Sequence, residues 1–546
     1  MKATKRIFSV FLTCVLAFTM AFAMGLTASA ADYTITINKP AGDIDRTYEA
    51  YQIFQGNLDG NTLSDIEWGT GIDGAAFLTE LKKNASFTSC TDAKTVAEKL
   101  AAFTNDSDEA VAFAKLAGKF LTTATATSSS GKITVPAGYY LLKDVTTVTD
   151  DALSLNILKV VQDVEVNPKA DHPSVDKKIG TDISTGAAAN TATIGDKVPF
   201  VIKSNVPKMQ GYTKYFFVLN DSMTAGLTYN KDVAIKIGAT TLAADAYDVV
   251  YDDTANTMKI VIKNFIQYKS EAGKDIVVTY SATLNEKADL TQAGNKNTVK
   301  LTYSNNPNVD YKGDNEPDTT DPVGETPEHV TVTYSTKLQL TKVDGADPNE
   351  KLEGVEFQIT GTSIKTAVSK GDYFKQDAAG TYYQLKDGTF TETAPTAETG
   401  SKYVSTSVKY AKVTDTAEQT KMQKVTASGT TDANGLITFE GLGAGTYYIT
   451  ELKTKSGYNL LTAPITVTIT AAPSATGCSW TVSTNAAFED DMVKLTVENN
   501  KGSVLPITGG IGTTIFYVIG GLLVCGAVVM AITKKKLSVE DKADQN

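Results

Sequence analysis

Hydrophobic and polar residues alternate along most of the chain between residues 32 and 500, in short runs bounded by Gly, Asn and Asp. Such runs are typical of strands that bury one face and expose the other. The pattern therefore predicts a mainly β protein. The clearest predicted strands lie at 33–37, 133–135, 138–142, 198–202, 215–219, 258–262, 276–280, 299–303, 338–342, 446–451 and 493–497.

The alternating runs fall into three blocks, at residues 31–168, 169–335 and 336–502, each long enough for one domain. Several short strands separated by turn residues are the pattern of an immunoglobulin-like sandwich. We therefore predict three such β-sandwich domains in tandem. In the second block a polar, proline-punctuated stretch at 305–327 predicts a long loop, with 330–334 returning to the sheet.

The first block also contains stretches with helical periodicity. Phe77 and Leu81 lie on one apolar stripe, Val96 and Leu100 on another, and residues 111–121 form a third. We predict helices inserted in the first sandwich, with these apolar faces toward its core.

Both ends of the chain carry long apolar segments. Residues 1–30 combine basic residues, an apolar run and then small residues up to Ala30, the pattern of a cleaved secretory signal peptide. An uncleaved membrane anchor is the alternative. Residues 511–532 are uncharged and are followed by three lysines at 534–536, which predicts a transmembrane helix with a cytoplasmic basic tail. The chain between these segments is then exported.

The composition limits what the exported chain can do. It has 51 basic and 62 acidic residues and a formal net charge of −11, which argues against binding to nucleic acid phosphates. Only two histidines are present, His172 and His329, so we predict no cofactor and no metal. No HExxH or GxSxG motif occurs, and we predict that the chain is not an enzyme; a secreted, wall-anchored enzyme is one alternative.

Cysteine usage excludes a disulfide framework. Of the four cysteines, Cys14 lies in the predicted signal peptide and Cys525 in the predicted span, while Cys90 and Cys478 lie in different blocks. A large exported protein without disulfides must resist proteolysis by packing or by another cross-link.

The residues before the C-terminal span resemble the LPxTG sorting signal of Gram-positive surface proteins. Leu505, Pro506, Ile507, Thr508 and Gly509 match that pattern, and the span and the lysines follow in the expected order. The resemblance implies that residues 503–546 are a cell-wall sorting signal. A sortase would cut between Thr508 and Gly509 and pass Thr508 to an amine. An ordinary single-pass protein with a chance pentapeptide is the alternative.

The three blocks resemble the major, or backbone, pilins of Gram-positive bacteria, whose CnaA-like and CnaB-like domains carry internal Lys–Asn isopeptide bonds. The resemblance runs from residues 48–56 to the sorting signal, and residues 434–451 are similar to the E-box region of a CnaB domain. It identifies an N-terminal pilin domain (31–168), a CnaA-like isopeptide domain (169–335) and a CnaB-like isopeptide domain (336–502). The bond residues that it implies are Lys177, Asp221 and Asn297 in the second domain and Lys342, Glu451 and Asn499 in the third.

Physical chemistry supports the same reaction. Strand alternation places Lys177 on one face with Val175 and Ile179, so its amine is expected in the core, whereas Lys178 points outward. Burial lowers the pKa of an amine and raises that of a carboxyl group, so both can be neutral. The neutral amine can then attack the Asn carboxamide, which the protonated acid polarises, and ammonia leaves.

In both domains we expect the lysine in the first strand and the asparagine in the last, so that a pull along the chain passes through the covalent bond. The alternatives are a solvated edge lysine and a turn asparagine. The first block has no comparable set. Lys39 and Asp144 could be proposed, but the closing strand at 160–166 contains no asparagine, and we predict no bond there.

A further lysine lies between the first and second blocks. Val160, Val164 and Val166 precede Asn167-Pro168-Lys169, which resembles the pilin motif whose terminal lysine joins subunits. Asn167 replaces the usual tyrosine of that motif. The proline keeps the connector extended, so that an enzyme can reach Lys169. A plain linker lysine is the alternative.

The resemblance implies a structural shaft subunit of a covalent surface pilus that contributes to adhesion. A pilin-type, class C sortase would join the carbonyl of Thr508 to the amine of Lys169 on the next copy, and a housekeeping sortase would attach the fibre to peptidoglycan. Further implied partners are accessory pilins and, as an open candidate, a host surface ligand. The chain is expected to be secreted to the cell wall, with a precursor anchored in the plasma membrane. A wall-anchored adhesin or accessory pilin that is not polymerised is the alternative.

Overall fold

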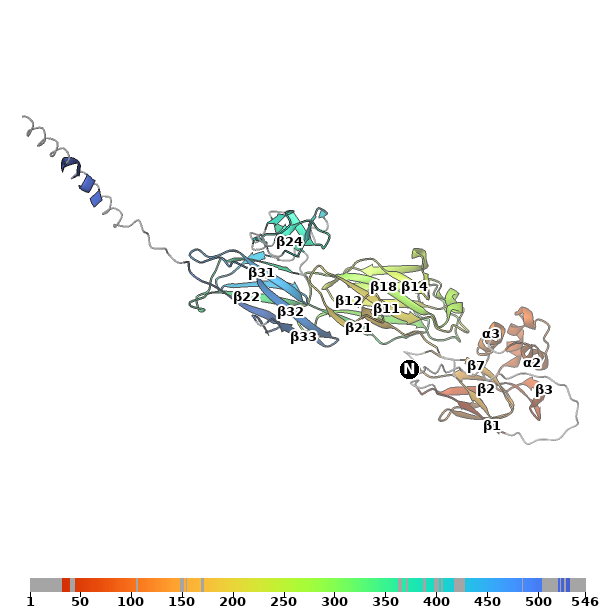
Figure 1. Cartoon of the computed structure of the whole chain (residues 1–546). Coiled ribbons are helices and arrows are strands. Elements are labelled where there is room, and N and C mark those ends of the chain that lie inside the picture. Colours follow the sequence, from red (N-terminus) through yellow and green to blue (C-terminus); the bar gives the residue numbers. More distant parts are fainter. Residues whose placement is uncertain are drawn as a thin grey trace, which may run out of the picture.

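The protein consists of three β-sandwich domains arranged in a row, with α-helices inserted in the first domain (Figure 1). The predicted fold, mainly β with helices inserted in the first domain, is confirmed. The computed structural model describes residues 32–39, 45–104, 107–147, 152–153, 155–167, 171–361, 366–369, 372–385, 389–396, 402–403, 406–416, 428–483, 485–502, 519–520, 522–524 and 527–530.

The first domain packs a sheet of order β5-β1-β8 near a sheet of order β3-β2-β6-β7, with β4 beside β2. Its helices are α1 (Gly74–Leu81), α2 (Ala93–Ala101) and α3 (Asp108–Ala117), with the 3₁₀ turn η1 (Ala85–Phe87). Asp73, Asp92 and Ser107 cap the three α-helices, because each side chain accepts a bond from a free backbone N–H of the first turn. The predicted stripes face a common core. The strands are β1 (Asp32–Ile37), β2 (Tyr48–Asp59), β3 (Thr62–Trp68), β4 (Ala126–Thr127), β5 (Lys132–Pro136), β6 (Gly138–Asp144), β7 (Leu155–Val160) and β8 (Val164–Val166).

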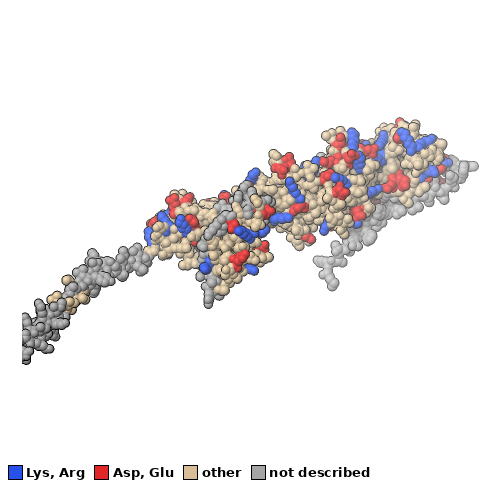
Figure 2. Space-filling model, turned by 90° about the horizontal axis from the view of Figure 1, so that it is seen from above, with Lys and Arg blue, Asp and Glu red and all other residues tan. Residues whose placement is uncertain are grey.

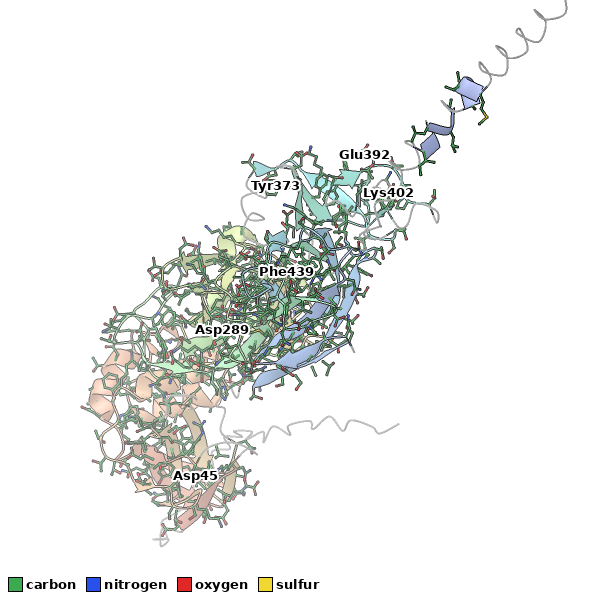
Figure 3. All side chains as sticks on the ribbon, turned by 90° about the vertical axis from the view of Figure 1, so that its left-hand side faces the viewer. Asp45, Asp289, Tyr373, Glu392, Lys402 and Phe439 are labelled. Atoms are coloured by element: carbon green, nitrogen blue, oxygen red, sulfur yellow. The ribbon has the colours of Figure 1, made fainter. Side chains whose placement is uncertain are left out.

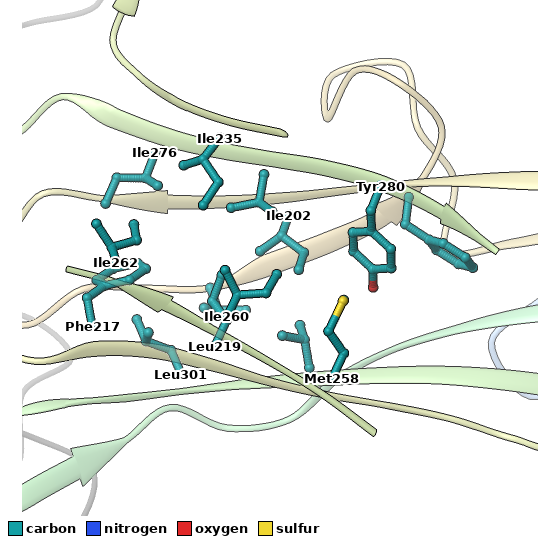
Figure 4. Close-up of a cluster of buried hydrophobic side chains, with 14 of the residues drawn as sticks. Ile202, Phe217, Leu219, Ile235, Met258, Ile260, Ile262, Ile276, Tyr280 and Leu301 are labelled. Carbon is teal, nitrogen blue, oxygen red and sulfur yellow. The ribbon is translucent and has the colours of Figure 1, made fainter. Parts of the chain in front are cut away.

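The second domain is a sandwich of two larger sheets, ordered β15-β14-β18-β11-β9 and β10-β21-β19-β12-β17-β16, with β13 and β20 at their sides. Ile202 and Ile276 from one sheet meet Leu219, Ile260 and Leu301 from the other (Figure 4). The strands are β9 (Asp176–Ile179), β10 (Ala189–Thr191), β11 (Lys197–Asn205), β12 (Phe217–Met223), β13 (Leu227–Tyr229), β14 (Ala234–Ile237), β15 (Thr240–Thr241), β16 (Tyr247–Asp252), β17 (Thr257–Ile262), β18 (Asp275–Leu284), β19 (Asn295–Ser304), β20 (Val323–Glu325) and β21 (His329–Tyr334), with 3₁₀ turns η2 (Ala244–Ala246) and η3 (Phe265–Glu271).

The third domain packs a sheet of order β30-β22-β35-β34 on a sheet of order β29-β23-β31-β32-β33. A small lobe is inserted between β23 and β29, which the sequence did not predict. Figure 3 shows its residues Tyr373, Glu392 and Lys402 away from Phe439, which lies in the sandwich. The strands are β22 (Thr336–Asp344), β23 (Glu356–Gly361), β24 (Thr366–Ser369), β25 (Asp372–Gln376), β26 (Tyr383–Gln384), β27 (Phe390–Thr391), β28 (Tyr410–Val413), β29 (Ser428–Thr430), β30 (Leu436–Leu442), β31 (Gly445–Lys453), β32 (Ile465–Ser474), β33 (Gly477–Val482), β34 (Ala487–Glu489) and β35 (Met492–Asn499).

The two junctions between domains differ in chemistry. The first is polar: Lys115 of α3 and Lys119, which follows this helix, both pair with Asp310 of the second domain, at 2.9 and 2.7 Å. The second is closely packed, because Tyr334 of β21 belongs to the hydrophobic core of the third domain. The backbone N–H of Ile194 also donates to the carbonyl of Gly441 at 2.9 Å.

Positive and negative side chains are interspersed along the elongated molecule in Figure 2, and the face shown has no large patch of one sign. Among the residues described, no helix has both the length and the apolar character needed to cross a bilayer. The predicted signal peptide lies outside the described residues, and so does most of the predicted span at 511–532.

Candidate functional site

The second domain brings Lys177, Asp221 and Asn297 together between its two sheets. Lys177 lies on the edge strand β9, where it pairs with Ile202 of β11, and its neighbours Val175 and Ile179 are buried on the same face. Asp221 on β12 pairs with Val299, and Met223 pairs with Asn297 on β19, so the acid and the amide share one face of the opposite sheet. The three side chains therefore meet across the core.

The contacts in this cluster are direct. The Nζ of Lys177 lies 2.6 Å from Oδ2 of Asp221 and also donates to Oδ1 of Asn297. The side chains of Lys177 and Asp221 are both 0% exposed. The rings of Phe200 and Tyr280 lie 5.4 and 5.6 Å from the same Nζ, so apolar surface surrounds the polar groups.

Burial changes the protonation equilibria of this cluster. Desolvation lowers the pKa of Lys177 to about 8, although Asp221 acts in the opposite direction. Burial likewise raises the pKa of Asp221 above its usual range, partly offset by Lys177. Both shifts favour neutral forms, a nucleophilic amine and a carboxyl group that can donate a hydrogen bond.

The third domain forms a similar cluster from Lys342, Glu451 and Asn499. Strand β22 runs parallel to β35, with Lys342 opposite Val497 and Asp344 opposite Asn499. Because side chains two residues apart in a strand lie on one face, Lys342 and Asn499 point to the same side of this sheet. Glu451 reaches them from β31 of the other sheet.

All three residues of the third-domain cluster are buried, with 0, 3 and 1% of Lys342, Glu451 and Asn499 exposed. Nδ2 of Asn499 donates to Oε1 of Glu451 at 2.6 Å and to the hydroxyl of Thr454 at 2.7 Å. The Nζ of Lys342 donates to the carbonyl of Val497 at 3.2 Å. Desolvation lowers the pKa of Lys342 to about 8, against the attraction of Glu451 and Glu498.

In the first domain the buried acid, Asp144, pairs with an arginine and not with a lysine. Lys39 forms an exposed ion pair with Asp45, whereas Asp144 is buried and pairs with Arg46 at 2.9 Å. The Arg46 guanidinium also donates to the carbonyl of Ala152. No sequence pattern indicated Arg46, because the arginine precedes β2 and only the fold brings it to Asp144 at the C-terminal end of β6.

The position of Asn297 differs from the expectation. The sequence analysis placed the asparagine of each domain in the last strand, which holds for Asn499 on β35. In the second domain β20 and β21 follow β19, and β21 pairs with β19 and with β10. The chain returns to the sheet at β21 after the long loop, as predicted for residues 330–334, and covers an edge of β19 that would otherwise be open.

Tyr280 is a further member of the second-domain cluster that the sequence analysis missed. Its hydroxyl donates to Oδ2 of Asp221 at 2.6 Å and accepts from Nδ2 of Asn297 at 3.0 Å. The alternation of β18 buries Val278, Tyr280 and Ala282, so the sequence could place the ring in the core but could not identify what its hydroxyl meets. Lys169 and the sorting residues Leu505, Pro506, Ile507, Thr508 and Gly509 lie outside the described residues.

Comparisons with known proteins agree with this architecture. The family model of the Gram-positive pilin backbone subunit 2, Cna-B-like domain, matches residues 194–307, and a SpaA prealbumin-like fold domain matches residues 336–483. The trypsin-resistant surface T6 protein of Streptococcus pyogenes is 26% identical over 404 residues, covering 67% of this chain and 70% of that protein. The chain is a homologue of Gram-positive backbone pilins.

The fold of this pilin homologue is also that of a solved pilin. The T6 backbone pilin of Streptococcus pyogenes, described as a modular three-domain structure, aligns with a TM-score of 0.51 at 15% identity, covering 87% of this chain and 100% of that chain. One label differs from the expectation. The family model describes the second domain of the pilin homologue as Cna-B-like, whereas the sequence analysis expected a CnaA-like domain.

Proposed function

We propose that the chain is the shaft subunit of a covalent surface pilus, and that its second and third domains each form an internal isopeptide bond. The observation that carries the proposal is the pair of buried lysine, acid and asparagine clusters in two successive domains of a backbone-pilin homologue. Burying a lysine beside a carboxamide lowers the stability of the domain, so stability does not explain this arrangement. It is well placed for an amide-forming reaction, because burial makes the amine nucleophilic and the fold holds its target in contact.

The reaction in the second domain joins Nζ of Lys177 to the side-chain carbonyl carbon of Asn297 and releases ammonia. In the third domain it joins Lys342 to Asn499. We expect the intact mass of the folded chain to be lower by one ammonia for each bond. Asn297→Ala and Asn499→Ala should each abolish one branched tryptic peptide and leave the other unchanged. A wild-type mass that shows no loss would contradict both bonds.

The two bonds place load differently. A bond from Lys342 to Asn499 joins parallel strands β22 and β35, the first and last of the domain, so a pull along the fibre bypasses the sandwich. A bond from Lys177 to Asn297 joins β9 of one sheet to β19 of the other, and residues after Asn297 carry the load on to β21. The second domain is then cross-linked through its core.

The link between subunits follows from the sequence motifs. A pilin-type sortase joins Thr508 of one copy to Lys169 of the next, and a housekeeping sortase attaches the finished fibre to peptidoglycan. The fibre lies on the cell surface, and its precursor is held in the plasma membrane. Accessory pilins and a host surface ligand are further candidate partners.

Polymerisation can be tested on cells that express the pilin-type sortase. Lys169→Ala should convert the ladder of covalent polymers on a denaturing gel to monomer. Lys208→Ala, which removes an exposed lysine elsewhere on the second domain, is the matched control and should leave the ladder intact. A ladder that persists in the Lys169 variant would reject this lysine, and the absence of any ladder in wild type would favour a non-polymerised adhesin or accessory pilin.

A further inference from the structure

The two clusters differ in how the acid reaches the nitrogen that must leave. In the third domain Oε1 of Glu451 contacts Nδ2 of Asn499 directly, at 2.6 Å. In the second domain Oδ2 of Asp221 accepts from Lys177 and from Tyr280, and Oδ1 is buried without a hydrogen-bond partner among the described residues. In the part of the chain that the structure describes, hydrogen bonds therefore connect Asp221 to Nδ2 of Asn297 only through the hydroxyl of Tyr280.

Tyr280 is fixed in this bridging position. Its side chain projects from β18 into the space between the sheets near Met258 (Figure 4), and only 3% of the residue is exposed. The ring stacks on Phe200 at 5.4 Å between centroids. Burial and the neighbouring Asp221 raise the pKa of Tyr280 well above its usual value, so the hydroxyl keeps its proton and can donate and accept at once.

The reaction needs such a group. An amide nitrogen is a poor leaving group unless it receives a proton, and the attacking amine must lose one. We propose that Tyr280 is a catalytic residue of the second-domain reaction, carrying a proton from Asp221 to the departing nitrogen of Asn297. This inference rests on the proposed bond between Lys177 and Asn297.

The steps balance without any other reactant. The neutral amine of Lys177 attacks the side-chain carbonyl carbon of Asn297, which leaves positive charge on Nζ and makes the former amide nitrogen a basic amine. The Tyr280 hydroxyl then turns to donate its proton to Nδ2 and accepts the proton of the neutral Asp221, and the carboxylate that remains takes a proton from Nζ. The bond from carbon to Nδ2 breaks, ammonia leaves, and the amide to Nζ remains.

The acid side chains of the two domains differ in length, but each is connected to the nitrogen that leaves. Aspartate is one methylene shorter than glutamate, and Tyr280 extends the reach of Asp221 to the leaving nitrogen. In the third domain Thr454 also contacts Nδ2 of Asn499, but Glu451 reaches that nitrogen itself. The third domain therefore does not need a relay and supplies an internal reference reaction in the same chain.

The test follows both reactions during refolding of the full chain from inclusion bodies. Samples are quenched in denaturant over time, and the branched tryptic peptides Lys177–Asn297 and Lys342–Asn499 are quantified separately. Tyr280→Phe, which keeps the ring, should slow formation of the second-domain branch by about 10²- to 10⁴-fold, the usual range for a general acid–base group. The third-domain branch should form at the wild-type rate.

Tyr229→Phe is the matched control, because Tyr229 is buried in the same core and its ring packs against Tyr280 at 6.2 Å. It should not slow either branch. Equal rates in wild type and Tyr280→Phe would overturn the relay while leaving the bond intact, whereas a wild-type chain without the Lys177–Asn297 branch would overturn the bond itself. Should the Phe variant fail to fold, 3-fluorotyrosine at position 280 keeps the hydroxyl but increases its acidity. An unchanged ratio of the two rates would then overturn the relay.

Discussion

Lys177 and Asp221 lie 44 residues apart in the chain and in opposite sheets, yet Nζ of Lys177 and Oδ2 of Asp221 meet at 2.6 Å in the core of the second domain. A buried pair of an amine and an acid contributes little net stability, because desolvation offsets their attraction. Its position beside Asn297 makes sense as the reactant state of a covalent bond. The same reasoning applies to Lys342, whose amine is buried within the third domain next to β35, the strand that carries Asn499.

Removing the second-domain bond should lower stability by the entropy of a large loop. Asn297→Ala leaves Lys177 unlinked. A cross-link that closes a loop of 120 residues raises the free energy of unfolding by about 4 to 5 kcal/mol in the chain-entropy treatment, and the variant should lose this amount. Asn220→Ala on β12 is the control, since it removes one hydrogen bond to Thr302 worth about 1 kcal/mol. Chemical denaturation measures both, and equal losses would argue against a covalent bond.

The first domain should depend on its buried ion pair. Arg46→Met removes the cation that pairs with the buried Asp144, and breaking a buried ion pair in this way typically costs about 3 to 5 kcal/mol. Lys39→Met removes the exposed pair with Asp45, and the expected loss is below about 1 kcal/mol. Trp68 reports unfolding of this domain when Trp480 of the third domain is replaced by Phe. A small effect of Arg46→Met would mean that the pair is dispensable.

Bond formation in the third domain should depend on pH. The pKa of Lys342 before reaction is about 8, lowered by burial. The neutral amine attacks, so the rate should rise about tenfold per pH unit up to that value and level off above it. Refolding at several pH values, with quantification of the Lys342–Asn499 branch, measures this profile. A rate that does not change between pH 6 and pH 8 would contradict attack by a titrating amine.

The junction between the second and third domains should be sensitive to one glycine. Gly441 has φ +74°, and a Cβ there would lie 2.3 Å from Cδ1 of Ile194. Gly457 has φ +88° with open space around it, so Gly457→Ala tests the backbone cost alone, about 1 to 2 kcal/mol. Gly441→Ala should lower the free energy of unfolding by about 1 to 3 kcal/mol more than Gly457→Ala, because the added methyl group overpacks the junction. Thermal unfolding measures both variants. Equal losses in the two variants would show that this contact is not tight.

Local patterns in the sequence predicted the elements well. The period of two in the strands and of 3.6 in α1, α2 and α3 decided which side chains face the core, and burial of Lys177 between Val175 and Ile179 agrees with that pattern. These features depend on residues close together in the chain. The inserted lobe at β24–β28 was not predicted, because its short strands are interrupted by polar residues.

The sequence by itself determined which face of β9 carries Lys177 and that the chain would be built from strands. Only the tertiary structure decided that β21 pairs with β19 and β10, that Arg46 rather than Lys39 pairs with Asp144, and that Tyr280 lies between Asp221 and Asn297. The physical reason is the distance along the chain between the residues that interact. Alternation is a property of one strand, whereas these meetings require the order of several strands and the packing of two sheets, to which residues far apart in the chain contribute together.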